Sequence, residues 1–233
     1  MARQGTAFVL GLDAPPASGP IVARLPKGMR ANTKSRTKLC GRADAARGTC
    51  PAESRIGSGR YVIDIAGFLN PGGQTQLTWS IDAFLGKPAN KGDIASVVLL
   101  AKLLGADSVA TLLTPELGMS VPVTATTTAR LRPGLEVRLP GVPVQLSVPL
   151  PSTATPSRLE LNLSAVHTTR ENFVRRIKVP TLSGYEIRKV PDHRLVSHYL
   201  FRAPDRCTGS WPYELLAGGR RTSGRISCTA TLL

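Results

Sequence analysis

The chain has 233 residues, of which 42% are hydrophobic, and a formal net charge of +15. A chain of this length can bury a substantial core, and its hydrophobic content excludes disorder throughout. The longest nearly apolar run covers residues 97–104 and is interrupted by Lys102. That run is far shorter than the roughly 20 apolar residues of a membrane-spanning helix, so we expect no transmembrane segment.

The N-terminal segment, MARQGTAFVLGL, has neither an uninterrupted apolar stretch nor a small-residue cleavage pattern. It is therefore not predicted to be a signal peptide. We expect either a cytosolic protein or an exported one whose signal has been removed. The domain-like sequence that follows the first Met directly favours the second alternative.

The positive charge is concentrated toward both ends of the chain. Residues 24–60 contain ten Lys and Arg against two acids, residues 165–233 contain twelve against five, and residues 61–164 contain seven of each. Such a field attracts polyanions, namely nucleic acid, an anionic lipid surface or an acidic cell-wall polymer. The alternative is a solvated basic surface without a partner. The residues that we predict to bind an anionic ligand are Arg24, Lys27, Arg30, Lys34, Arg36, Lys38, Arg55 and Arg60.

The first predicted elements lie between residues 40 and 66. Cys40 and Cys50 close a basic loop with little apolar content, and the glycines of "RIGSGRY" predict a turn that leads into a strand at residues 61–66. The alternative for residues 57–59 is an anion nest of backbone amides beside Arg55 and Arg60. A phosphate loop would follow a strand and open a helix, whereas this stretch precedes a strand.

The next elements are strands with one apolar face. Leu77, Trp79, Ile81 and Ala83 alternate with polar residues, which is typical of a half-buried strand. Residues 93–104 are compatible with a helix that is capped by Asp93 and stopped by Gly105. They also fit a hairpin that joins residues 97–104 to 109–113, and we prefer the hairpin because its neighbours are strands.

The second half of the chain repeats this pattern. Residues 144–150 and 159–165 alternate between apolar and polar, which predicts two further strands. The proline-rich stretch at 132–156 is the best candidate for a domain boundary, but it contains a strand of its own. We therefore predict a single domain over residues 1–233, with 132–156 as the place where it would divide. Thr168 and Glu171 form a capping box, so a short helix is compatible with that position.

Residues 207–228 predict a hairpin around Gly218-Gly219. Directly opposed residues in a hairpin have a constant index sum, and Cys207 with Cys228 gives 435, which places the turn between Ala217 and Gly218. The two sulfurs would then face each other at a distance that a disulfide allows.

The four cysteines thus form two sequence-local pairs, Cys40 with Cys50 and Cys207 with Cys228. Zinc sites usually bring their ligands in closely spaced pairs such as C-x-x-C, which these spacings do not match. We predict two disulfides, each stabilising by roughly 3 kcal/mol, with free buried thiols and a metal or catalytic site as alternatives. Disulfides imply an oxidising compartment.

Three segments carry a resemblance to a known family. "LPKGMRAN", "CPAESRIGSG" and "FRAPDRCTGSWPYELLAGGR" followed by "SCTA" resemble a group of uncharacterised exported actinobacterial proteins. These share an LP.G…N segment, a C…CP..S.IGSG motif and a closing P..C…W…C module. The similarity is clearest over residues 40–70 and 200–230. It implies export, disulfides and a β-rich fold, and it implies no activity; the sequence departs from the group in lacking a visible signal peptide.

No set of residues predicts catalysis. His193 and His198 would lie on opposite faces of a strand, so they make a poor metal site. The acids between residues 64 and 160 are scattered and give no pair of carboxylates for glycoside hydrolysis. The "GSG" at residues 57–59 has the wrong spacing for a nucleophilic serine. We therefore predict no cofactor, no metal and no enzymatic activity, and keep a hydrolase with a site not visible in the sequence as an alternative.

Together these patterns predict an all-β, antiparallel β-sandwich, Ig-like or jelly-roll-like, stapled by disulfides and with at most one or two short helices. The predicted function is that of an extracellular or cell-envelope protein that docks on an anionic polymer through its basic surface. A nucleic-acid-binding β protein is the main alternative, and the charge is its only support, because aromatic residues for base stacking make up just 5% of the chain.

Overall fold

The structure is a computed structural model that describes residues 5–16, 19–66, 74–105, 124–141, 154–204 and 209–227. Three predictions lie outside the described residues: the strand at 144–150, the hairpin arm at 109–113, and the pairing of Cys207 with Cys228.

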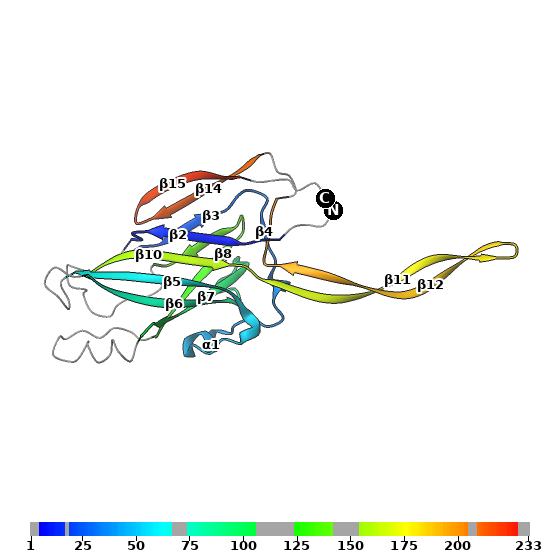
Figure 1. Ribbon diagram of the computed structural model, residues 1–233, viewed down its shortest axis with the longest axis horizontal. Coiled ribbons are helices and arrows are strands. Elements are labelled where there is room, and N and C mark those ends of the chain that lie inside the picture. The colour runs from blue at the N-terminus through cyan, green and yellow to red at the C-terminus, as the bar shows by residue number, and fades with distance from the viewer. Residues whose placement is uncertain are drawn as a thin grey trace.

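Antiparallel strands make up most of the described chain (Figure 1). The largest sheet has ten strands in the order β15 (Arg220–Ser227), β14 (Ser210–Ala217), β3 (Ile21–Arg24), β9 (Glu136–Leu139), β8 (Thr124–Arg132), β7 (Ala95–Leu103), β6 (Gln74–Gly86), β5 (Arg55–Ala66), β10 (Ala154–Leu163) and β2 (Phe8–Asp13). A three-stranded sheet joins β1 (Gly5–Thr6), β13 (Phe201–Arg202) and β4 (Arg30–Ala31). A two-stranded sheet joins β11 (Val166–Thr181) and β12 (Gly184–Tyr199). The described residues also form one helix, α1 (Arg42–Arg47), and two 3-10 turns, η1 (Thr33–Ser35) and η2 (Ala52–Ser54).

One hydrophobic core covers a face of the ten-stranded sheet. The alternation predicted for β6 is confirmed, because its apolar members Leu77, Trp79, Ile81 and Ala83 are all buried. The same alternation is confirmed on β10, where Leu159, Leu161 and Leu163 are buried. A single cluster of buried side chains includes Phe8 of the end strand β2 and Ile21 of β3 from the other half of the sheet. The sheet therefore curls around its core.

The two ends of the curled sheet meet without a hydrogen-bonded ladder. The end strands are β2 and β15, and a cavity of about 360 Å³ lies between β2 and the β14–β15 pair. Phe8 and Leu10 line it from one side, and Leu215 and Ile226 line it from the other. The ends therefore face each other through apolar side chains.

Strand β7 is buried on both faces, which explains its nearly continuous apolar sequence. On the outer face, Val98 packs with Phe84 of β6 and with Cys40 and Ala45 of the loop that contains α1. Burial on both faces removes the alternation of apolar and polar residues. The sequence of residues 93–104 was therefore compatible with a helix as well as with a strand. The helix alternative for residues 93–104 is wrong, and the observed partners of β7 are β6 and β8.

Gly57 and Gly59 lie inside β5 rather than in a turn, and β5 is paired on both sides. A Cβ atom at Gly57 would collide with the carbonyl of Asn162, and one at Gly59 would collide with the carbonyl of Glu160. The glycines therefore allow β10 to approach β5 closely. The predicted turn is therefore wrong. The alternative of an anion nest at residues 57–59 is wrong as well, because these residues are part of the extended strand β5.

A long ribbon formed by β11 and β12 projects from the body of the protein (Figure 1). The two strands pair over their whole length and turn at residues 182 and 183. The short helix that the capping box suggested is therefore wrong. The hydroxyl of Thr168 lies 3.3 Å from that of Ser197, and Glu171 accepts a hydrogen bond from Arg194 at 3.1 Å. Side chains that could cap a helix instead form cross-strand pairs.

Strands β14 and β15 form the predicted C-terminal hairpin, but its register differs by two. Ser210 pairs with Ser227, so opposed residues sum to 437 (210 + 227) instead of 435. The two turn residues, Gly218 and Gly219, have φ angles of 55° and 76°, as a two-residue type I′ turn requires. The turn is therefore centred between Gly218 and Gly219, one residue later than the index sum predicted.

Over the described ranges, the predicted fold class, an antiparallel all-β fold with a disulfide and at most one or two short helices, is confirmed. Strands β9 and β10, on either side of residues 140–153, belong to the same ten-stranded sheet. The division into domains stays a prediction.

Candidate functional site

The ribbon is anchored in the body at its base. Leu200, which follows β12, is buried and donates its amide hydrogen to the carbonyl of Ala165 at 2.8 Å. Arg36 donates hydrogen bonds to the carbonyls of Arg55 and Val166 at 2.5 and 3.0 Å. These contacts fix the direction in which both strands leave the core.

The register sorts the side chains of the ribbon onto two faces, because opposed residues share a face and successive residues alternate. One face carries four cations and no acid: Arg170, Arg176, Lys178 and Lys189. None of the four forms an ion pair with a described residue. Arg170 contacts His193 at 2.9 Å, and Lys178 lies over the ring of Tyr185 at 4.4 Å. We call this surface the basic face.

The opposite surface, which we call the paired face, carries all three acids of the ribbon. Each acid forms an ion pair with an arginine of the same face: Glu171 with Arg194 at 3.1 Å, Glu186 with Arg188 at 3.2 Å, and Asp192 with Arg175 at 3.8 Å. The ribbon has seven Lys and Arg against three acids, so its excess positive charge lies on the basic face.

The ribbon also exposes large apolar side chains. Of the eleven large hydrophobic residues that are exposed in the described chain, eight lie on it: Val166, Phe173, Val174, Leu182, Tyr185, Ile187, Val190 and Leu195. Leu182, at the turn, is fully exposed. Five of the eight are on the basic face: Val166, Val174, Tyr185, Ile187 and Leu195. Cations without carboxylate partners and apolar groups on one surface are typical of an interaction site.

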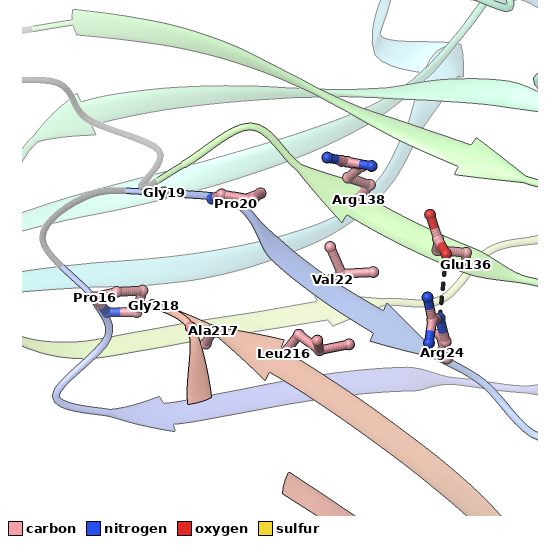
Figure 2. Close-up of a pocket in the computed structure, with 11 residues that line it drawn as sticks. Pro16, Gly19, Pro20, Val22, Arg24, Glu136, Arg138, Leu216, Ala217 and Gly218 are labelled. Atoms are coloured by element: carbon pink, nitrogen blue, oxygen red, sulfur yellow. Dashed lines mark hydrogen bonds and ion pairs between the residues drawn. The ribbon is translucent and has the colours of Figure 1, made fainter. Parts of the chain in front are cut away.

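A second candidate is the open groove of about 630 Å³ that Figure 2 shows over β3, β9 and β14, beside the turn at Gly218. Val22 and Leu216 contribute apolar surface, and Arg138 forms no ion pair with a described residue. The described residues that line the groove include no Ser, Thr, Cys or His. The groove therefore offers less recognition chemistry than the ribbon.

Arg24, a predicted anion-binding residue, lies in this groove but is bound within the protein (Figure 2). Its hydrogen bonds to Glu214 at 3.1 Å and Glu136 at 3.3 Å raise its pKa. Each of these glutamates also pairs with a second arginine: Glu136 with Arg132 of β8, and Glu214 with Arg221 of β15. The five side chains form a row of alternating charges across β8, β9, β3, β14 and β15, which holds neighbouring strands together.

Three more predicted anion-binding residues have partners inside the protein. Arg36 binds two backbone carbonyls, and burial lowers its pKa. Lys38 pairs with Glu53 at 2.8 Å and holds the pKa of that carboxyl below its usual range. Arg55 pairs with Asp82 at 2.5 Å.

The other four predicted residues are exposed and form no ion pair with a described residue: Lys27, Arg30, Lys34 and Arg60. They come from separate elements, with Arg30 on β4, Lys34 on η1 and Arg60 on β5. Of the eight predicted anion-binding residues, four thus contact other groups of the protein, and four are exposed at separate positions.

Cys40 and Cys50 form the predicted disulfide, with their Cα atoms 5.0 Å apart. The loop that they close contains α1, which the sequence analysis did not predict. Gly48 ends this helix with a φ of 67°, and its amide hydrogen bonds to Ala45 and Asp44. The bridge packs against Phe84 and Val98 of the sheet, so its role here is structural.

No group of three or more metal-ligating side chains occurs among the described residues. His193 and His198 lie on opposite faces of the ribbon, as their spacing predicts for a strand. His198 contacts the hydroxyl of Thr169 at 2.9 Å.

The ribbon is not among the predicted sites, although the sequence contains a signal for it. Residues 173–179 and 185–190 both mix β-branched or aromatic residues with cations, and Leu182-Ser183-Gly184 separates them. Two such segments around a short turn that contains Gly are typical of a hairpin.

Among the described residues, no helix is long and apolar enough to cross a membrane. No protein-family model, curated protein or solved structure matches the chain. The resemblance to exported actinobacterial proteins therefore stays a prediction.

Proposed function

We propose that the chain is a non-catalytic docking protein of the cell envelope that binds an anionic envelope component through the basic face of its ribbon. The observation that carries this proposal is the sorting of charge. All three acids of the ribbon are paired with arginines on one face, and the other face holds four cations without carboxylate partners.

The spacing of these cations suits an extended polyanion. Residues on one face of a strand recur about every 7 Å, so Arg176 and Lys178 can contact neighbouring anionic groups of one linear molecule. Lys189 lies directly opposite Arg176 on the partner strand. Several contacts of this kind give binding that is strong at low salt and falls steeply as salt rises.

The envelope location is supported by the disulfide between Cys40 and Cys50, because disulfides persist in oxidising compartments. The resemblance to exported proteins agrees with it. A nucleic-acid-binding protein is the second candidate, since a two-stranded ribbon fits the major groove of DNA. A reducing compartment, where most nucleic acid is found, does not favour the disulfide.

The test compares two matched sets of charge removals in the full chain. The ribbon variant is Arg176→Gln with Lys178→Gln and Lys189→Gln; the body variant is Lys27→Gln with Lys34→Gln and Arg60→Gln. Polyphosphate of defined length is the probe, and its affinity is measured over a series of salt concentrations. The ribbon variant should bind about tenfold or more weakly at low salt, and its salt slope should fall by about 3, or about 1 per cation removed.

The body variant removes the same charge and should bind almost as the unmodified chain does. Circular dichroism of both variants checks that the fold is kept. Loss of binding in the body variant alone would place the docking site on the body and refute the proposal. Clearly tighter binding to duplex DNA than to polyphosphate of equal charge would favour the nucleic-acid alternative.

A further inference from the structure

We propose that the anionic component is the phosphate surface of a lipid bilayer, and that the turn of the ribbon and the outer part of its basic face enter that surface. This inference rests on the proposed function and names its partner. The outer part of the ribbon, residues 174–191, is called the tip below.

The apolar side chains of the tip are the reason to prefer a bilayer. Leu182 is fully exposed, and Tyr185 and Ile187 are 61% and 57% exposed. A hydrophilic polymer accounts for the cations of the basic face, but it gives an aliphatic side chain no apolar environment. Transfer of such a side chain out of water is favourable only into an apolar phase, which the acyl region of a bilayer supplies.

The order of residues along the tip fits the layers of a bilayer surface. Between Lys178 and the turn the basic face carries no charge, and at about 3.3 Å per residue this segment spans roughly 13 Å. A tilted ribbon can therefore place Leu182 at the boundary of headgroups and acyl chains, which lies about 5–10 Å deep. Lys178 and the pair of Arg176 with Lys189 then lie at the level of the phosphates.

Two side chains of the tip suit this interface individually. Tyr185 has an apolar ring and a polar hydroxyl, and such residues favour the headgroup level. Lys178 lies over that ring at 4.4 Å, so its long aliphatic stem can follow apolar surface while its ammonium group remains among phosphates.

The tip contains one acid, Glu186, and its charge does not repel the phosphates of the bilayer. Glu186 points to the paired face and forms an ion pair with Arg188 at 3.2 Å. If the basic face lies on the bilayer, Glu186 stays on the water side with its charge compensated. A second copy packed basic face against basic face is a poorer occupant, because the cations of the two faces, which have no carboxylate partners, would repel one another.

The experiment measures binding of the full chain to vesicles of phosphatidylcholine alone and to vesicles that also contain phosphatidylglycerol. Three variants are compared: Leu182→Ser, the ribbon charge variant defined above, and Val9→Ser. Val9 is the matched control because it is 68% exposed on β2 of the body.

The chain should bind the anionic vesicles and not the neutral ones. Leu182→Ser should weaken vesicle binding about tenfold, the effect of one exposed leucine leaving water, and should leave polyphosphate binding unchanged. The ribbon charge variant should weaken binding to both probes, and Val9→Ser should weaken neither. In a separate measurement, Leu182→Trp fluorescence should be quenched by brominated acyl chains, whereas Val9→Trp fluorescence should not.

The outcomes separate this inference from the function on which it rests. Unchanged vesicle binding by Leu182→Ser, with binding still lost in the ribbon charge variant, would overturn insertion and leave polyanion docking in place. Unchanged binding of both probes by the ribbon charge variant would overturn the proposed function as well. Self-association that depends on Leu182, or tighter binding to duplex DNA than to anionic vesicles, would replace the bilayer with a second copy or with nucleic acid.

Discussion

The β5–β6 pair of the body and the β11–β12 pair of the ribbon are both long antiparallel pairs, but different interactions stabilise them. In the body, β5 pairs with β6, and Tyr61 and Trp79 lie opposite each other, buried, with ring centroids 6.0 Å apart. In the ribbon, β11 pairs with β12, and most of its large apolar residues remain exposed. Burial stabilises the first pair, whereas the second relies on its ladder and on cross-strand side-chain contacts.

The exposed apolar residues of the ribbon contribute little to its stability. A two-stranded ribbon alone in water is marginally stable, and exposed Leu, Ile and Tyr side chains add little to it. These residues do not serve the fold of the isolated chain, so we infer that they serve a partner.

The largest effect is expected from removing the ring of Trp79, which is fully buried. Trp79→Ala should destabilise the protein by about 4 kcal/mol, since it leaves a cavity in the core. Tyr185→Ala, a comparable truncation on the ribbon, should leave the global free energy of unfolding unchanged within about 0.5 kcal/mol. Urea unfolding followed by circular dichroism measures both. A similar loss in the two variants would show that the ribbon belongs to the cooperative core.

The next effect concerns the disulfide. Replacing Cys40 and Cys50 together by Ser should destabilise the body by about 3 kcal/mol, because the unfolded chain regains the freedom of the closed loop. Thermal unfolding measures the change. Below the new melting temperature the variant should still bind polyphosphate as the unmodified chain does, since the bridge lies on the sheet and not on the ribbon. Lost binding by the folded variant would contradict this independence.

A smaller effect that depends on pH is expected at Asp93. Its carboxylate is 1% exposed and accepts two hydrogen bonds from Arg130 at 2.9 and 3.0 Å, which hold its pKa below the usual range. Because the folded-state pKa is the lower one, this stabilisation is present above about pH 4 and is lost as the pH falls through the folded-state pKa.

Asp93→Asn should therefore lower the melting temperature by a few degrees at neutral pH. The difference in melting temperature between the variant and the unmodified chain should become smaller in acid. A series of thermal melts at different pH values measures this difference. If this difference in melting temperature stays constant with pH, the ion pair of Asp93 with Arg130 does not contribute to stability. The paired face of the ribbon offers a contrast, since Glu171 is more exposed and its removal should shift the melting temperature less.

The parts of the fold that the sequence predicted are those with one buried and one exposed face. The alternation from Leu77 to Ala83 predicted β6, because burial on one side imposes a period of two. The disulfide between Cys40 and Cys50 was predictable from cysteine number and spacing. Residues 93–104 were ambiguous for the opposite reason, since β7 is buried on both faces and keeps no polar alternation.

The ribbon was not predictable by the same signal, because neither of its faces is buried in a core. Without a buried face, the local capping pair of Thr168 and Glu171 was the stronger pattern, and it pointed to a helix. Gly57 and Gly59 misled in a different way. Glycine marks both turns and close backbone contacts, and only the position of β10 shows which of the two applies.

The length of the ribbon has an electrostatic consequence. Sixteen cross-strand pairs at about 3.3 Å each give an arm of roughly 50 Å. Physiological salt screens exposed charges beyond about 8 Å. The far end of the arm is therefore several screening lengths from most charges of the body, and a partner there meets the local field of a few cations. The isoelectric point of the whole chain governs its solubility and its migration in an electric field, but it does not describe the surface that the tip presents.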